Sequence, residues 1–188
     1  LDSVFQVVSF ISTTGFGNAD NALWPALANV FLILAALHCG CSGSTTGGLK
    51  ADRMLIVFKE IGSEFKRRLH PSSVIRTKVD EHSVNNDQVA AVFLYVVAYA
   101  FILFILFIAA LISGADISDA FSGTLASLGN VGPGLDGLGT MGNYASQPVF
   151  AKLIYTAAMF LGRLEIFPVL AVLHLAYGSI SGKNSHIS

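Results

Sequence analysis

Long apolar runs alternate with short polar stretches along this chain. Residues 89–112 carry no charged side chain, and as a helix these 24 residues would span roughly 36 Å, enough to cross the hydrocarbon core of a bilayer. A second apolar run covers 149–178, and a third, over 26–58, is interrupted by a glycine-rich stretch at 40–48. The pattern predicts three helices that cross a membrane, one of them broken near its middle.

Two further apolar segments, 2–13 and 117–130, are too short to span a bilayer. Each ends in a glycine-containing stretch and precedes a predicted membrane helix. This layout predicts re-entrant pore helices followed by loops at membrane depth, where backbone that is buried or lines a cavity is tolerated. We therefore expect an all-α membrane protein of tandem helix–pore-helix–helix units with re-entrant filter loops, the first unit truncated.

The charges predict the orientation. Eight of the 11 lysines and arginines lie close together, and short basic segments stay in the cytoplasm. They are Lys50, Arg53, Lys59, Lys66, Arg67, Arg68, Arg76 and Lys78. We divide the chain into a truncated first unit (1–58), a cytoplasmic basic loop (59–87), a complete second unit (88–180) and a tail (181–188), with both pore loops facing outside.

Composition agrees with a membrane protein, because 53% of the residues are hydrophobic and 12% are charged, against about 25% charged in soluble domains. The net charge of −1 gives no reason to expect a nucleic acid partner. Cys39 and Cys41 are too few for a disulfide framework, and a lone C-x-C pair favours packing at a helix end over a metal site. Because the chain opens on Leu1 in mid-pattern, without a methionine or a signal peptide, we expect a fragment of a longer protein.

The two short segments share a layout. From Asp2 to Gly15 and from Asp119 to Gly132, an acid starts an apolar helix that ends in small or polar residues and a glycine. The two acids are predicted helix N-caps. One such glycine loop alone would favour an ordinary turn, but two at matched distances favour an internal repeat.

Loops of this kind can select a cation. A dehydrated K⁺ needs several oxygens in place of its water shell, and converging backbone carbonyls provide them. Glycine at positive φ lets successive carbonyls point the same way, and a helix directs its partly negative C-terminal end towards the ion. The predicted selectivity filter consists of the backbone carbonyls of Thr13, Thr14, Gly15, Phe16, Asn130, Val131, Gly132 and Pro133.

The interruption of the third apolar run predicts a gate. Its small and polar residues need a protein-lined or wet cavity at membrane depth, because an unpaired backbone group in lipid is costly. A phosphate-binding loop is the competing interpretation, but Leu49 separates Gly48 from Lys50, and Ala51 stands where that motif needs serine or threonine. The predicted gating loop is Gly40, Cys41, Ser42, Gly43, Ser44, Thr45, Thr46, Gly47 and Gly48.

Arg163 and Glu165 are charges near the middle of the last apolar run, where charged side chains are costly and usually functional. Side chains two residues apart do not face each other on a helix, so each needs its own partner. For Arg163 two interpretations stay open: a latch that binds the gating loop, or a structural clamp between helices. For Glu165 we expect a clamp.

Four motifs together resemble a known family. They are STTGFG at 12–17, GCSGSTTGGLK at 40–50, GNVGPGL at 129–135 and GRLE at 162–165. In this order, and over nearly the whole chain, they are similar to the Trk/Ktr potassium-uptake family, and most to its TrkH-type pore-forming subunits. The chain would be the C-terminal part of such a subunit.

The resemblance implies four repeats around one pore in a multi-pass protein of the inner (plasma) membrane that takes up K⁺. This chain would hold the last two repeats, with filter glycines at Gly15 and Gly132, a gating loop at 40–48 and a loop-facing arginine at Arg163. The resemblance also implies a homodimer in the lipid bilayer and a cytosolic nucleotide-binding regulatory subunit of the TrkA/KtrA type, on the side of 59–87. K⁺ is the expected permeant ion, and no cofactor is expected.

Two other classes of function compete with a pore. An ion-coupled secondary transporter also uses broken helices, but its repeats are often inverted, whereas these two run in the same direction, which favours a pore. An intramembrane enzyme would use Glu165, but the sequence offers no convincing nucleophile, metal set or second catalytic partner. We therefore expect no enzyme.

Overall fold

The computed structural model describes residues 1–38, 40–41, 44, 46–70, 78–79, 82–164 and 175. This part of the chain is helical apart from a pair of two-residue antiparallel strands, β1 (Lys78–Val79) and β2 (His82–Ser83). The structure therefore confirms the all-helical fold that the hydropathy pattern predicts.

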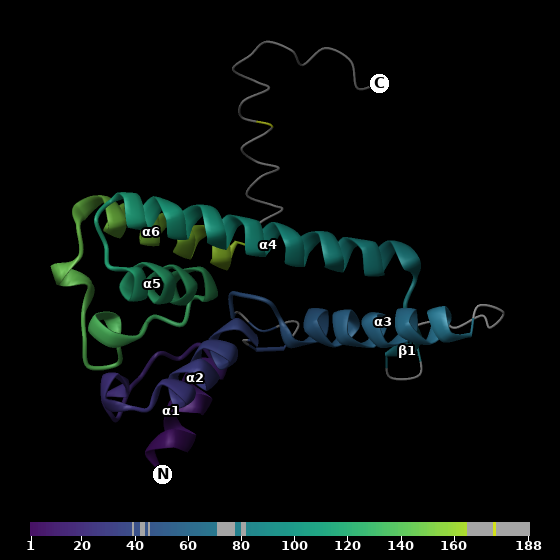
Figure 1. The fold of residues 1–188 in the computed structure, drawn as a ribbon, viewed down its shortest axis with the longest axis horizontal. Helices are drawn as coiled ribbons and strands as arrows, with labels where there is room; N and C mark the ends of the chain where they lie inside the picture. Colours follow the sequence, from purple (N-terminus) through teal and green to yellow (C-terminus); the bar gives the residue numbers. More distant parts are fainter. Residues whose placement is uncertain are drawn as a thin grey trace.

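The uncharged run after the basic segment forms one long helix, α4 (Asn86–Ile112), of 27 residues. Among the described residues it is the helix that is long and apolar enough to cross a membrane. At its start the Gln88 side chain accepts a hydrogen bond from the Asn85 backbone N–H (3.3 Å), which satisfies one of the unpaired donors of a helix N-terminus. The helices α3, α5 and α6 pack along α4 (Figure 1).

A short helix of the second unit, α5 (Ile117–Gly129), packs against both α4 and α6 (Val149–Arg163) (Figure 1). Every residue from 122 to 129 is buried. Glycine permits this close packing, since a Cβ at Gly123 would lie 2.7 Å from the Leu138 side chain and 3.0 Å from the Tyr155 ring. A buried helix of 13 residues, too short to span a bilayer, is what the sequence predicts for a pore helix.

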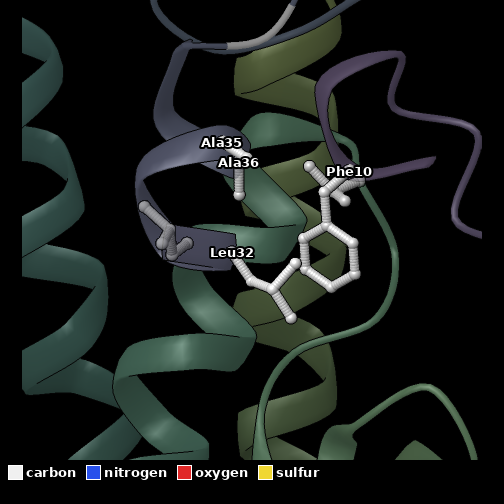
Figure 2. Close-up of a cluster of buried hydrophobic side chains, with 6 residues drawn as sticks. Phe10, Leu32, Ala35 and Ala36 are labelled. Atoms are coloured by element: carbon white, nitrogen blue, oxygen red, sulfur yellow. The ribbon is translucent and has the colours of Figure 1, made fainter. Parts of the chain in front are cut away.

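The first unit comprises α1 (Asp2–Ile11), the short 3₁₀ turn η1 (Asn21–Leu23) and α2 (Ala26–His38). The helix α1 packs on α2, and α2 packs on α5. Figure 2 shows the cluster between them, in which Phe10 of α1 meets three side chains of α2. The cluster also takes in residues of the second unit, so the two units share one core. Its members are Phe10, Leu32, Ala35, Ala36, Leu125 and Val131.

After the interruption the chain resumes as α3 (Ala51–Leu69), which packs against α4. The segment predicted as a basic loop from residue 59 is therefore helical up to Leu69. A physical reason lies in its charge pattern: Glu64 pairs with Arg67 at 3.1 Å and with Arg68 at 3.4 Å, and opposite charges three or four residues apart support a helix.

The last apolar run is described in part. The helix α6 covers the beginning of the predicted helix at 149–178. The predicted clamp Glu165 and the tail at 181–188 lie outside the described residues.

Candidate ion-selectivity site

The loops that follow the two short helices have the same backbone conformation. We call residues 12–17 the first loop and residues 130–134 the second loop. Thr13 and Asn130 are both left-handed, with φ of 53° and 55°, and the glycines two positions later also have positive φ, 75° at Gly15 and 103° at Gly132. Residues other than glycine rarely adopt this backbone conformation. The predicted internal repeat is thus present in the backbone, although residue identity is low.

The two short helices also end in the same way. The Thr14 N–H donates to the carbonyl of Ser9 (3.0 Å), and the Val131 N–H donates to the carbonyl of Ala126 (2.9 Å). These bonds close the last turn and satisfy carbonyls that a helix end leaves unpaired. Each partly negative helix end is therefore directly followed by its loop.

The two loops lie in contact. Gly15 approaches the carbonyl oxygen of Val131 so closely that a Cβ at Gly15 would collide with it, and the same Cβ would lie 3.3 Å from the ring of Pro133. No described atom lies within 4 Å of a Cβ built at Gly132. Glycine is thus required at position 15 by φ and by space, and at position 132 by φ alone.

One carbonyl in each loop is held by a hydroxyl group. Ser9 Oγ donates to the carbonyl of Phe16 (2.7 Å), and Tyr144 Oη, from the turn η3 (Tyr144–Ser146), donates to the carbonyl of Gly132 (2.8 Å). Burial raises the pKa of Tyr144 to about 12, so its phenol remains a donor at physiological pH. Because a carbonyl oxygen has two lone pairs, these bonds direct the carbonyls without exhausting them.

The prediction that Asp2 and Asp119 are N-caps is wrong. The N-cap positions belong to the residue before Asp2 and to Asp116, and both acids lie within the first turn. Each instead accepts a hydrogen bond from an amide that returns over the start of its helix: Asn18 Nδ2 donates to Asp2 (2.9 Å) and Gln147 Nε2 to Asp119 (2.7 Å). The acids therefore tie each short helix to the segment after its loop.

The predicted gating loop meets the second unit. Gly47 lies against the C-terminal end of α5, since a Cβ there would be 2.8 Å from both the carbonyl oxygen of Gly129 and the side-chain nitrogen of Asn130. Cys41 is exposed, with a free thiol. The loop thus touches the start of the second loop. The described members of the gating loop are Gly40, Cys41, Ser44, Thr46, Gly47 and Gly48.

Arg163 is the last residue of α6, and its neighbour Gly162 packs against α5. A Cβ at Gly162 would collide with the carbonyl oxygen of Leu128 and would lie 2.8 Å from Asn130 Nδ2. Asn130 Nδ2 in turn donates to the carbonyl of Met159 (3.3 Å). The end of α6, the end of α5 and the gating loop therefore converge on the Asn130 side chain, and Arg163 directly follows Gly162 in the sequence.

Sequence reasoning missed four polar residues that support the loops. They are Gln6, Asn21, Thr140 and Tyr144; Gln6 and Asn21 are 0% exposed. A glutamine inside an apolar segment at membrane depth is a signal that points to Gln6. For Asn21 and Thr140 no local pattern exists, because their shared hydrogen bonds join residues 119 positions apart.

The chain matches, over residues 1–182, the family described as TrkH, cation transport protein. It is 38% identical over 175 residues to the Trk system potassium uptake protein TrkH of Halomonas elongata. The aligned residues cover 93% of this chain and 36% of that protein. It is also 38% identical over 168 residues to TrkH of Escherichia coli K12, covering 89% and 34% of the two chains.

The fold is similar to the crystal structure of the potassium transporter TrkH from Vibrio parahaemolyticus, with a TM-score of 0.83 and 35% identity over 92% of this chain and 36% of that one. The chain spans about a third of the length of these relatives. With a family match over nearly its whole length, the chain belongs to the TrkH family of cation transport proteins.

Proposed function

We propose that this chain is part of the pore-forming subunit of a K⁺ uptake system of the inner membrane, and that 13–16 and 130–133 are two of the loops of its selectivity filter. The observation that carries the proposal is the pair of contacting loops with matching left-handed residues, Gly15 against Val131. The names of the relatives, potassium uptake proteins and a potassium transporter, support K⁺ as the ion.

The mechanism follows from the loop backbone. Carbonyl oxygens of the two loops replace part of the water shell of K⁺, and the contact between the loops keeps those oxygens at set positions. The C-terminal ends of α1 and α5 add partial negative charge at the point where the ion loses water. No side-chain carboxylate takes part in this proposal, in keeping with the need for K⁺ to leave the site as well as to enter it.

Residues 40–48 act in this proposal as the gate, and Arg163 holds the gate closed as a latch. Support comes from two contacts at Asn130, one made by Gly47 of the gating loop and one by Gly162, the neighbour of Arg163. A shift of the gating loop would therefore change the contact of Gly47 with Asn130, the first residue of the second loop.

The proposed assembly is a homodimer in the lipid bilayer with a cytosolic nucleotide-binding regulatory subunit of the TrkA/KtrA type. The last turn of α3 carries three basic residues, Lys66, Arg67 and Arg68. This supports a cytoplasmic position for 59–87, since basic segments stay on that side, and it offers positive charge to a regulatory partner.

The test uses the whole protein of which this chain is a part, expressed in cells that lack K⁺ uptake. We expect the wild type to restore growth at low K⁺, and Gly132→Ser to lower the ratio of K⁺ to Na⁺ influx, because it strains the loop backbone. A wild type that does not restore growth, or a Gly132→Ser variant with an unchanged ratio, contradicts the proposal.

Arg163→Ala tests the latch in the same cells. Loss of the guanidinium should raise K⁺ influx per amount of protein in the membrane. Unchanged or lower influx would instead support the structural clamp between helices.

A further inference from the structure

We infer that Asn21 and Thr140, with Gln6 behind them, form a clamp that sets the distance between the two filter loops and thereby positions the loops for ion selection. We call these three residues the interloop clamp. The inference rests on the proposed function of the loops and extends it to residues outside the filter.

Asn21 binds the second unit with both ends of its side-chain amide. It is 0% exposed. Its Nδ2 donates to the carbonyl of Gly134 (3.1 Å), and its Oδ1 accepts from the backbone N–H of Thr140 (3.0 Å). Gly134 directly follows Pro133, the last predicted filter residue. One side chain of the first unit therefore holds the end of the second loop.

Thr140 makes the reciprocal connection. Its Oγ1 donates to the carbonyl of Ala19 (2.6 Å), in the segment that follows the first loop. The same carbonyl accepts from Gln6 Nε2 (2.7 Å), and Gln6 belongs to α1 and is itself 0% exposed. The chain after each loop is thus bound to the other unit, and the first is also bound to its own pore helix.

Two glycines bring the backbone into close contact with the clamp residues. A Cβ at Gly139 would collide with the Oδ1 of Asn21, and a Cβ at Gly17 would collide with Thr140, whose methyl carbon would lie 2.8 Å away. The hydrogen bonds oppose separation of the two segments, and these backbone contacts oppose closer approach. The clamp therefore fixes the spacing in both directions.

The spacing matters because a carbonyl filter distinguishes K⁺ from Na⁺ by the size of its cavity or by the number and field of its carbonyls. Either account requires that the loops stay at set positions. If the clamp only held the fold together, its loss would change the amount of protein without changing ion preference. The clamp contacts lie one residue beyond the predicted filter, at Gly17 and Gly134, which favours the positioning role.

The test uses the whole protein in cells that lack K⁺ uptake, and measures K⁺ and Na⁺ influx per amount of protein in the membrane. Asn21→Ala leaves the carbonyl of Gly134 and the N–H of Thr140 unpaired, and we expect the ratio of K⁺ to Na⁺ influx to fall about tenfold. The matched control is Asn18→Ala, an exposed asparagine of the neighbouring segment that bonds within its own unit, to Asp2. An Asn21→Ala variant with the ratio of the Asn18→Ala variant overturns the inference.

A second pair of variants decides the matter if Asn21→Ala does not reach the membrane. Thr140→Val keeps the shape and the backbone N–H but removes the hydroxyl that donates to Ala19, whereas Thr140→Ser keeps the hydroxyl. We expect Thr140→Val to lower the ratio and Thr140→Ser to remain near the wild type. Equal ratios for the two variants overturn the inference.

The clamp and the filter can fail separately. If the wild type does not restore growth at low K⁺, or Gly132→Ser leaves the ratio unchanged, the proposed function fails and the clamp fails with it. If the wild type restores growth and Gly132→Ser lowers the ratio while the Asn21 and Thr140 variants leave it unchanged, the clamp alone fails.

Discussion

The first and second loops have the same backbone and very different surroundings. Val131, one residue before its glycine, is 3% exposed and packs in the shared core, whereas Thr14 at the matching position is exposed. The helices before them differ in the same sense: α5 is buried from residue 122 to its end, while Val8 of α1 is 59% exposed. The loop conformation is thus a local property of a helix end with a glycine, whereas the burial of each loop depends on what packs behind it.

The hydroxyl groups that bond to the loop carbonyls also come from different surroundings in the two units. Ser9 holds the carbonyl of Phe16 from within the helix that precedes the first loop, seven residues away. Tyr144 holds the carbonyl of Gly132 from a separate turn that follows the second loop, 12 residues away. The second loop therefore receives support from its own helix, from the core and from the next segment.

The largest effect is expected at the glycines. Gly15→Ala should abolish K⁺ uptake by the whole protein, because a Cβ would collide with the carbonyl of Val131 and would also sit at positive φ, which costs about 1–2 kcal/mol. Gly132→Ala has the φ cost but no neighbour within 4 Å, and should retain part of the uptake. Rubidium influx and membrane abundance measure the difference, with Gly62→Ala in α3, where a Cβ meets nothing within 4 Å, as control. Equal effects at the two glycines would argue against contact between the loops in the working protein.

The next largest effect is a difference in thermal stability between variants of the two acids, Asp119 of α5 and Asp2 of α1. Asp119→Ala removes the acceptor of Gln147, which is 8% exposed, and leaving a buried amide unpaired costs about 1–3 kcal/mol. Asp2→Ala loses only an exposed bond to Asn18, and surface changes of this kind stay within about 0.5 kcal/mol. The thermal midpoint of the purified whole protein checks this, and similar shifts for both variants would remove the contrast between the two units.

A smaller effect is expected from the hydroxyl groups. Ser9→Ala and Tyr144→Phe each remove one hydrogen bond to a loop carbonyl, worth about 0.5–1.5 kcal/mol, which corresponds to about a two- to tenfold change in the ratio of K⁺ to Na⁺ influx. The effect should be larger for Ser9→Ala, because the first loop has no counterpart to the buried Val131. Ser3→Ala, at an exposed position of α1, is the control. A larger effect of Tyr144→Phe would mean that the second loop, and not the first, depends more on its hydroxyl hydrogen bond.

The smallest effect concerns pH. Burial raises the pKa of Tyr144 from 10.0 to about 12. Because the pKa is raised, the contribution of the neutral phenol to stability is fully present below pH 10 and is lost as pH rises through about 12. Between about pH 6 and 9 the bond to Gly132 should not titrate, so ion preference of the wild type and of Tyr144→Phe should change with pH in parallel. A difference between them that grows with pH in this window would contradict the assignment.

Much of the fold could be predicted from the sequence because hydropathy and length are properties of neighbouring residues. The uncharged run gave α4, the short apolar segments gave α1 and α5, and equal spacing from acid to glycine predicted two matching loops. The N-cap prediction failed because a carboxylate near a helix start can accept from a side-chain amide as well as from the helix N–H groups. Asp119 accepts a hydrogen bond from the Gln147 side-chain amide, and the N-cap position of α5 belongs to Asp116.

The sequence by itself determined the membrane class, the two short apolar helices and the two loop glycines at positive φ, because hydrophobic length and the absence of a Cβ act locally. Only the tertiary structure decided that Gly15 meets Val131, that Gly47 and Gly162 converge on Asn130, and that Asn21 binds Thr140. These contacts join residues far apart along the chain, and they form only when α1, α2, α5 and α6 pack together and leave buried polar groups that must pair with one another.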